Sequence, residues 1–372
     1  MAKAVYVGVG SKARKMKKAY VGIGGTARKV KKMYIGDSSG KARLCYSAEL
    51  EYGGTAAGLM ENRVNPAAAS VGNYLIFFGG RNESSYLTST AVDAYNTSLT
   101  KVSITQLSLN GRDALGTASI GNYALFAGGY TDFINDLMTT GVAVYDKSLT
   151  YSHTRTNLSC SNYNGLGGVA GGSVGNYAVF AGGESRRNSD EKIFKQSNVT
   201  AYNASLTKVN ISALSSVMSY MKSASVGKYV VFLGGVASCA YNDALTKTRL
   251  ESHSASDRGV SFGNYALFNT GGTIYAYDTS LTRTTQSTLT YERSGCGGTS
   301  LKDYAIFAGG YDAGDYEAVV DFFDTSLTKT RGTNMAQARS LCAGGTVGDY
   351  ALFAGGTTGR SSYVATVDVY TA

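Results

Sequence analysis

The same short apolar run recurs seven times along this chain, each time between glycine or polar residues. It reads GNYLIFFGG from Gly72, GNYALFAGG from Gly121 and GDYALFAGG from Gly348, and successive tyrosines lie 36 to 54 residues apart. The run is apolar without alternation, which is typical of a strand covered on both faces. Self-similarity at such a period predicts a repeat architecture.

Each repeat is predicted to supply four strands. Small residues such as PAAAS or CAGGT precede the apolar run and suit a crowded axis where sheets converge. A V-x-x-Y/F strand follows Gly-Gly, and then comes a turn reading N/D-x-S/A-L-T, whose Asn or Asp can cap its own backbone. The last strand alternates polar with apolar residues, as an outer edge strand does. Seven such units predict an all-β fold, a closed seven-bladed β-propeller.

The phasing of the repeats predicts how the ring closes. The seventh copy ends at VDVYTA without a fourth strand, whereas KARLCYSAE at residues 41–49 precedes the first copy and has the character of a fourth strand. We therefore expect this N-terminal strand to complete the last blade. The predicted domains are a basic β-hairpin arm over residues 1–40 and the propeller over residues 41–372.

The formal net charge of +9 is concentrated at the N-terminus. Residues 1–48 hold 12 of the 35 Lys and Arg residues but one of the 26 acidic residues. The arm contains three repeats, VYVGVGSKARKMKK, AYVGIGGTARKVKK and MYIGDSSGKARLCY, whose pattern predicts consecutive hairpins. Such a cationic arm suits an acidic protein, a polyanionic cell wall or nucleic acid. Nucleic acid is unlikely as a partner because tyrosines at this period fit hairpin packing better than base stacking.

Composition excludes several classes of function. No apolar run reaches the ~20 residues that span a bilayer, and the start lacks the apolar core and cleavage site of a signal peptide. Five cysteines without a C-x-x-C pair argue against a disulfide framework or a zinc site, and favour a compartment that keeps thiols reduced. His153 and His253 are expected on outer strands, which disfavours a metal cage and histidine-dependent nucleophilic catalysis. We expect no metal and no cofactor.

The repeat resembles the kelch repeat. It has Gly-Gly after an apolar strand, a V-x-x-Y-N/D strand and, in four copies, an Arg 11 residues before the tyrosine, but it lacks the tryptophan usual after the third strand. In ligand-binding kelch domains the residues after Gly-Gly and the inner-strand Arg line one face. The resemblance therefore implies a ligand-binding role for Arg81, Asn82, Arg63, Arg112, Arg293 and Arg339.

The segments between the second and third strands are predicted to emerge on one face of the propeller. They are tight in blades four and five, and the other five blades carry 12 to 18 residues rich in aromatic, Arg and carboxylate side chains. Such residues suit recognition of a glycan or protein. The further candidates are Tyr86, Tyr130, Asp132, Phe133, Arg186, Arg187, Tyr311, Asp312, Tyr316, Arg360 and Tyr363. Alternatively, the loops are merely solvated and the arginines pair with neighbouring blades. The carboxylates of Asp132, Glu184, Asp312, Asp315 and Glu317 leave glycoside hydrolysis as another alternative.

The repeats of the arm are similar to the N-termini of tail-associated proteins encoded by phages and prophages of Gram-positive bacteria. The resemblance implies that the arm docks on other tail or baseplate proteins, through Tyr6, Lys15, Lys17, Tyr20, Lys29, Lys31 and Tyr34. We expect a non-enzymatic, homo-oligomeric virion protein, assembled in the bacterial cytoplasm, whose propeller binds a host-surface glycan or protein. The alternatives are a purely structural tail component, a protein-interaction scaffold unrelated to phage, and a carbohydrate-active enzyme.

Overall fold

The computed structural model describes two units of the chain, Met1–Glu51 with Ala372, and Tyr52–Thr371. The residues described are 6–9, 12–15, 20–23, 26–30, 32–36, 42–47, 50–82, 87–102, 104, 111–153, 156–160, 165–187, 189–252 and 257–372. All regular elements in these ranges are β-strands, as the repeat pattern predicts. None of these ranges holds a helix that is both long and apolar enough to cross a membrane.

The first unit contains three consecutive hairpins, which confirms the prediction for the arm. The first two hairpins pair an apolar strand with the basic strand after it, and Tyr6 is in register with Lys15 as Tyr20 is with Lys29. Tyr34 lies on the first strand of the third hairpin, whereas Lys17 and Lys31 lie outside the described residues. The pairs are β1 (Tyr6–Val9) with β2 (Lys12–Lys15), β3 (Tyr20–Ile23) with β4 (Thr26–Lys29), and β5 (Lys32–Gly36) with β6 (Ala42–Ser47).

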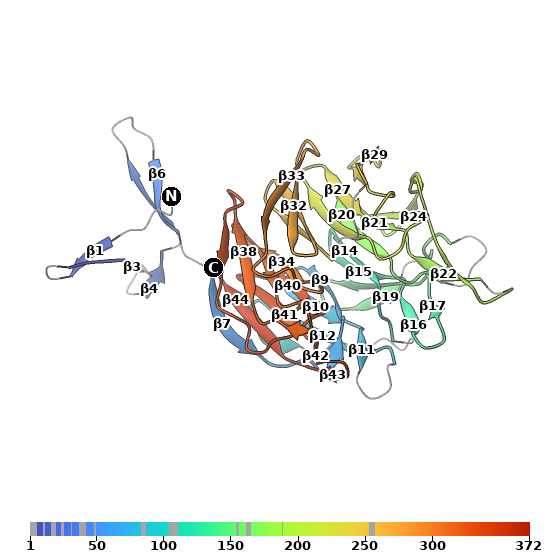
Figure 1. Cartoon of the computed structure of the whole chain (residues 1–372), viewed down its shortest axis with the longest axis horizontal. Helices are drawn as coiled ribbons and strands as arrows, with labels where there is room; N and C mark the ends of the chain where they lie inside the picture. The colour runs from blue at the N-terminus through green and yellow to red at the C-terminus, as the bar shows by residue number, and fades with distance from the viewer. Residues whose placement is uncertain are drawn as a thin grey trace. The chain divides into compact units, whose positions relative to one another are not determined.

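The second unit is a seven-bladed β-propeller of four-stranded antiparallel sheets (Figure 1). The innermost strands are β9 (Ala67–Val71), β14 (Gly116–Ile120), β20 (Ala170–Val174), β26 (Lys222–Val226), β30 (Arg258–Phe262), β34 (Gly297–Leu301) and β40 (Ala343–Val347). The second strands are β10 (Tyr74–Phe78), β15 (Tyr123–Ala127), β21 (Tyr177–Ala181), β27 (Tyr229–Leu233), β31 (Tyr265–Thr270), β35 (Tyr304–Ala308) and β41 (Tyr350–Ala354). The third strands are β12 (Val92–Asn96), β18 (Val142–Asp146), β24 (Val199–Asn203), β28 (Cys239–Asn242), β32 (Thr273–Asp278), β38 (Val320–Asp324) and β44 (Val367–Thr371). The outer strands are β13 (Lys101–Val102), β19 (Tyr151–His153), β25 (Lys208–Val209), β29 (Lys247–Arg249), β33 (Arg283–Thr288), β39 (Lys329–Arg331) and β7 (Glu51–Ala56).

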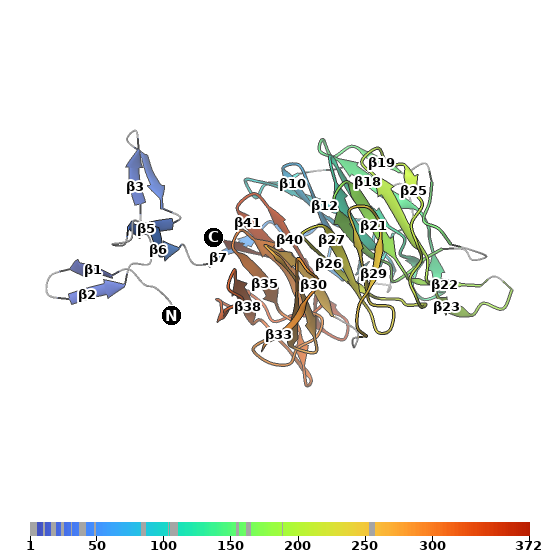
Figure 2. The ribbon, with the colours of Figure 1, turned by 90° about the horizontal axis from the view of Figure 1, so that it is seen from above.

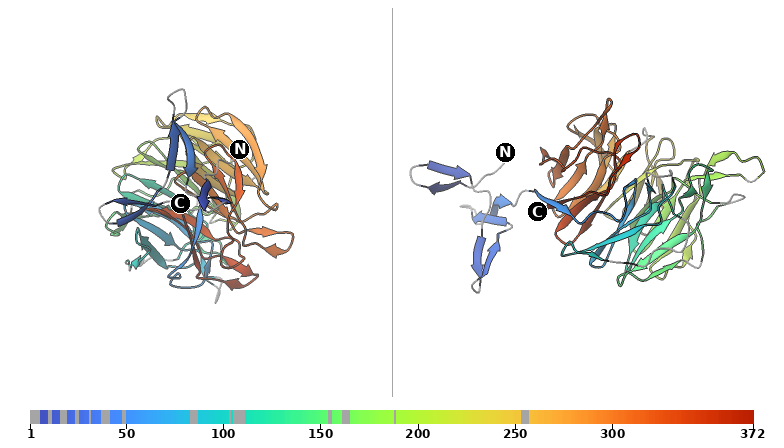
Figure 3. Two further views of the ribbon diagram at one scale, coloured as in Figure 1. Left: turned by 90° about the vertical axis from the view of Figure 1, so that its left-hand side faces the viewer. Right: turned by 90° about the horizontal axis from the view of Figure 1, so that it is seen from below.

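The ring closes through the N-terminal side of the chain, but the closing strand differs from the one expected. Strand β7 pairs with β44 and completes the last blade (Figure 3). The Tyr52 hydroxyl donates a 2.7 Å hydrogen bond to Asp368, and its ring packs against Tyr370. The expectation that residues 41–49 close the ring was wrong because β6 pairs with β5 in a hairpin of the arm. The propeller sheets therefore begin about ten residues later than predicted.

Small inner-strand residues let the seven blades approach a common axis, and hydroxyls connect the blades there. The fourth residue of every inner strand is Ser or Thr. The hydroxyls of Ser70, Ser119, Ser173 and Ser225 each donate to the inner-strand carbonyl of the preceding blade, at 2.5–2.7 Å. Thr346 donates to Ser300 in the same way. These hydrogen bonds satisfy polar groups at the crowded axis and hold neighbouring blades in register.

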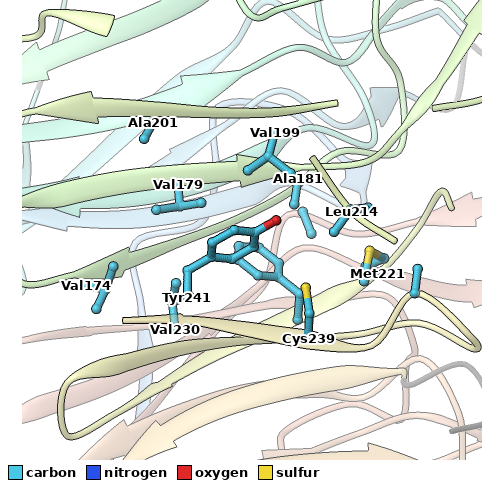
Figure 4. Close-up of a cluster of buried hydrophobic side chains, with 13 residues drawn as sticks. Val174, Val179, Ala181, Val199, Ala201, Leu214, Met221, Val230, Cys239 and Tyr241 are labelled. Atoms are coloured by element: carbon cyan, nitrogen blue, oxygen red, sulfur yellow. The ribbon is translucent and has the colours of Figure 1, made fainter. Parts of the chain in front are cut away.

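The core lies between the faces of adjacent blades. In one cluster, Val179 and Ala201 of the third blade pack against Val230 and Tyr241 of the fourth (Figure 4). Both faces of the second strands are buried, which explains their mostly apolar sequence, and in three of the third strands a buried position holds an aspartate. Within the described part of the chain, Cys160, Cys239, Cys296 and Cys342 are free thiols, and the last three are buried core residues. His153 lies exposed on outer strand β19, and His253 is outside the described ranges.

Three blades share a buried arginine–aspartate clasp. The guanidinium of Arg63 pairs with Asp93 of the third strand at 2.6 Å and donates to the Phe77 carbonyl of the second strand. The same carboxylate accepts the backbone N–H of Met60, three residues before the arginine. Equivalent pairs join Arg293 to Asp321 and Arg339 to Asp368. The clasp therefore fastens each incoming inter-blade segment to its own blade.

Five blades carry a hairpin between the second and third strands, and blades four and five do not, as the loop lengths predict. In Figure 2 the β22–β23 hairpin extends beyond the sheet of its blade. We call the side of the propeller formed by these hairpins the hairpin face. In four blades the hairpin strands are β16 (Tyr130–Asp132) with β17 (Leu137–Met138), β22 (Glu184–Arg186) with β23 (Ile193–Lys195), β36 (Tyr311–Asp312) with β37 (Asp315–Tyr316), and β42 (Thr357–Gly359) with β43 (Ser362–Tyr363). In blade one, Arg81 forms an antiparallel bridge with Thr88, and β11 (Arg81–Asn82) also pairs with β8 (Arg63–Val64), which precedes the inner strand.

Candidate functional site

A collar of backbone groups surrounds the mouth of the central channel on the hairpin face. Its members lie two residues after the position of the clasp arginine and have positive φ values. The N–H of Gly168 donates to Ala114 of the preceding blade, and Tyr220 donates to Gly168, both at 2.8 Å. Leu341 and Asn65 continue the pattern in the last and first blades. The backbone hydrogen bonds of the collar hold neighbouring blades together around the rim of the mouth. Its described members are Asn65, Ala114, Gly168, Tyr220, Gly295 and Leu341.

Two adjacent blades place cations just inside this mouth. The first inner-strand residue is Ala or Gly in five blades, but it is Lys222 in blade four and Arg258 in blade five. These are also the two blades without a hairpin. Both side chains are half-buried. The cations therefore lie beneath the open sector of the hairpin face.

Cavities extend from the mouth into the channel. A cavity of about 280 Å³ is lined by the collar residues Asn65 and Tyr220 together with Lys222 and Arg258. An adjoining cavity of about 530 Å³ shares these four residues and reaches Tyr311 and Tyr316 on blade six. The rings of these two tyrosines contact each other, with centroids 5.1 Å apart, and Tyr311 is 41% exposed. The cavity thus has an aromatic wall beside a cationic one.

A tyrosine–carboxylate chain connects the rim residue Tyr220 to Tyr130 and Glu184. The Tyr130 hydroxyl donates to the Glu184 carboxylate, and the Tyr220 hydroxyl donates to Tyr130 at 3.4 Å. A Cβ at Gly167 would collide with the Tyr130 ring and one at Gly168 would crowd the Tyr220 ring, so the two glycines leave room for these rings. Burial, followed by the hydrogen bond to Glu184, raises the pKa of Tyr130. Tyr130 is 3% exposed and lines neither cavity, so the chain supports the Tyr220 side chain from within the protein.

A second polar network fixes the first hairpin to the rim. Asp113 accepts from the Arg81 guanidinium at 2.9 Å and from the Asn65 side chain at 2.7 Å. Burial raises the pKa of Asp113, and Arg81 and the hydrogen bonds oppose the shift. The guanidinium of Arg81 also lies 4.5 Å from the centre of the Phe133 ring. Arg81 and Phe133 therefore belong to the rim, as the sequence suggests, but Arg81 is already paired.

The positive charge of Lys222 is poorly compensated. Burial, followed by repulsion from Arg258, lowers the pKa of Lys222 to about 8, and Asp257 opposes the shift. No hydrogen bond or ion pair joins the Lys222 ammonium to another described residue. Arg258 is held by a 2.9 Å hydrogen bond from Nε to the Cys296 carbonyl. The arrangement resembles an anion site, because two adjacent cations share a cavity with one carboxylate.

The four inner-strand arginines do not line this mouth. Arg63, Arg293 and Arg339 have no exposed surface, and Arg112 is 3% exposed. Three are the clasp arginines, and Arg112 donates to the carbonyls of Phe126 and Gly141. A ligand cannot reach these buried side chains, so the ligand-binding role predicted for them is wrong. The alternative of pairing with neighbouring blades also fails, because each arginine bonds the strands of its own blade.

The remaining candidates lie on the hairpins, and several are engaged within them. The Asp132 carboxylate accepts from Ile134 and Asn135, which lowers its pKa, chiefly through the Asn135 side chain. Arg186 pairs with Glu191, and Arg187 pairs with Asp190. Asn82 and Asp312 are half-buried strand residues, Arg360 is exposed, Tyr363 is 7% exposed, and Tyr86 lies outside the described residues. Of the predicted set, Tyr311 and Tyr316 line the cavity that also contains the cations.

Comparison with known proteins supports the fold of the propeller but assigns no function. No family model and no curated protein sequence matches the chain. One solved structure of similar fold, "Structure of YjhT", gives a TM-score of 0.56 at 12% sequence identity. The match covers 85% of this chain and 97% of that one. Similarity at this level supports the propeller architecture alone.

Sequence reasoning missed Lys222, Arg258 and Tyr220. The stretch containing Lys222, KSAS, fits the small-residue pattern, and this hides the lysine at its first position. Aligning the seven inner strands at that position would have exposed the two cations, because every other blade has Ala or Gly there. In the described residues, no group of three or more His, Cys, Asp and Glu side chains is placed to hold a metal.

Proposed function

We propose that this chain is a non-enzymatic component of the tail or baseplate of a phage or phage-derived particle, with a propeller that binds a host-surface glycan. The basic arm docks on neighbouring tail proteins, and the kelch-like propeller presents its hairpin face to the cell. The observation that carries the binding role is the cavity at the mouth of the channel, where Tyr311 and Tyr316 face the Lys222 and Arg258 side.

The shape and chemistry of this mouth favour a glycan. A tyrosine ring offers a flat apolar surface for a sugar face, and its hydroxyl offers a hydrogen-bond partner. A concave, largely preformed site with a few polar groups is the usual form of a small-ligand site. The clasps and the collar supply the rigid support that such a site needs, because the rim is fixed backbone.

Removal of the exposed aromatic groups is expected to weaken attachment to host cells by about 100-fold, the effect of losing one or two strong contacts. The variant combines Tyr311→Ala, Tyr316→Ala and Tyr220→Asn; Asn is chosen because Tyr220 has φ +57°. Binding of the labelled full-length protein to host cells gives the measurement. The control combines Lys147→Ala, Lys228→Ala and Asp243→Ala, exposed residues in turns away from the mouth. Equal binding by both variants would reject the mouth as the receptor site.

The particle assignment has its own test. Antibodies against the arm should label the tail or baseplate of purified particles in electron micrographs, and neighbouring genes should encode tail sheath, tape measure or lysin. A protein found only in particle-free fractions, with no such genes beside it, would contradict the assignment.

A further inference from the structure

The two cations at the mouth, Lys222 and Arg258, indicate the chemical class of the glycan that binds there. Lys222 and Arg258 occupy a register position that five other blades fill with Ala or Gly, so the fold of a blade does not require a long cationic side chain there. Both side chains line the 530 Å³ cavity. Two neighbouring cations at one level of the channel concentrate positive potential at its mouth.

Asp257 is the one carboxylate among the described residues that line the 530 Å³ cavity. The charged groups acting on Lys222 are Arg258 and Asp257. The carboxylate of Asp257 also accepts the backbone N–H of Gly271 at 3.1 Å. Tyr311 and Tyr316 line the wall beyond. Tyr220 also lines the cavity, and burial raises its pKa to about 12, so it is neutral at physiological pH.

Arg258 is held in place by packing as well as by its hydrogen bond. Its side chain runs over Gly298 of blade six, where an added Cβ would lie 2.5 Å from Arg258 Cγ. With Nε bonded to the Cys296 carbonyl, the guanidinium is a fixed positive charge beside the more adaptable lysine. The combination of a fixed guanidinium and an ammonium suits an anionic group.

Resting on the proposed function, we infer that the mouth takes an anionic group of the host-surface glycan, a phosphodiester or carboxylate, between Lys222 and Arg258. The neutral sugar rings lie against Tyr311 and Tyr316. A flat protein surface fits less well, because the cations are half-buried inside a cavity that a single sugar or phosphate can enter.

The test measures binding of the full-length protein to three probes. A glycerol phosphate oligomer carries phosphodiesters, a galacturonate oligomer carries carboxylates, and a maltose oligomer is uncharged. We expect one or both anionic probes to bind at least tenfold more tightly than the neutral one. Their relative affinities identify the source of the anion. Equal affinity for all three probes would overturn the inference.

Variants at Lys222 test the residue itself. Lys222→Gln should weaken binding of the anionic probe about tenfold or more, and Lys222→Arg should retain it. Lys228→Ala is the matched control, because it removes the same charge from the exposed turn that follows the strand of Lys222. An equal loss in Lys222→Gln and Lys228→Ala would show only a general charge effect and overturn the inference.

The pH dependence of probe binding can be measured first on the wild-type protein. The anion binds the protonated ammonium, so affinity should fall as pH rises from 7 to 9, through the pKa of about 8. In Lys222→Arg this fall should disappear. Isotope-labelled methylation of the wild-type protein should show one lysine amine, distinct from the α-amino group, with a pKa near 8 that rises on addition of the probe. An unchanged titration would contradict the site.

Host-cell binding separates this inference from the proposed function. Cell attachment that survives Lys222→Gln would overturn the anion site and leave glycan recognition standing. Anionic probes that bind a protein with no affinity for host cells would support the pocket chemistry and contradict the receptor role.

Discussion

A chain shortened to residues 57–372 is expected to lose the folded propeller, whereas a chain shortened to residues 50–372 is expected to keep it. The first deletion removes β7, the outer strand of the last blade. It thereby exposes β44, removes the ring contact of Tyr52 with Tyr370 and breaks the Tyr52–Asp368 hydrogen bond. Burial, with the contribution of Asp368, raises the pKa of Tyr52 to about 12, consistent with a hydroxyl held in the sheet.

The expected cost of this deletion is large relative to the stability of a domain. Loss of several ladder hydrogen bonds at about 1 kcal/mol each, together with the tyrosine contacts, removes about 5 kcal/mol or more. Natural domains have about 5–15 kcal/mol in total. Circular dichroism and thermal melting of the two shortened chains provide the measurement. Equal melting temperatures would show that residues 50–56 do not close the ring.

Breaking one clasp should produce the largest effect of any single substitution considered. Asp321→Ala leaves the buried Arg293 guanidinium without its carboxylate and the Thr290 N–H without its acceptor. Removal of one partner from a buried ion pair costs about 3–5 kcal/mol. We expect the free energy of unfolding, measured by denaturant titration, to fall by that amount.

Blade two supplies the matched control for the clasp. Its Arg112 occupies the clasp position, but Ala143 stands where the other three blades have aspartate. Burial lowers the pKa of Arg112, and no carboxylate pairs with it in the described part of the chain. Arg112→Met removes an unpaired buried charge but also the hydrogen bonds to the Phe126 and Gly141 carbonyls. It should therefore lower the unfolding free energy by about 1–2 kcal/mol, less than Asp321→Ala does. A loss equal to that of Asp321→Ala would contradict the importance of the ion pair.

The sequence predicts the propeller well because each blade repeats the same local sequence pattern. Apolar runs, Gly-Gly turns and N/D-x-S/A-L-T turns recur often enough to define four strands per blade without any tertiary information. The closing strand was placed wrongly because KARLCYSAE has the character of an edge strand, whereas the strand that closes the ring, EYGGTA at residues 51–56, contains two adjacent glycines and lacks a clear alternation. Pairing between distant segments decides between them, and one chain's pattern does not encode it.

The site was less predictable for a related reason. The four inner-strand arginines carry charge, and charge in a loop-like position suggests a ligand. Their partners Asp93, Asp321 and Asp368 lie about 30 residues away, so burial in the clasp follows only from the fold. Conversely, Lys222 lies in a small-residue stretch and becomes notable only when the seven blades are superimposed. Tyr311 and Tyr316 were predicted because aromatic side chains in these segments are typical of ligand recognition, and this inference does not depend on their exact positions.

Hydrogen exchange of the full-length protein with purified host-wall polysaccharide tests the central claim, that the mouth on the hairpin face receives the ligand. We expect protection to increase in residues 218–223, 257–260 and 310–317, and to stay unchanged around Ser70, Ser119 and Ser173 near the other end of the channel. Protection confined to that other end, or to the outer strands, would contradict the account.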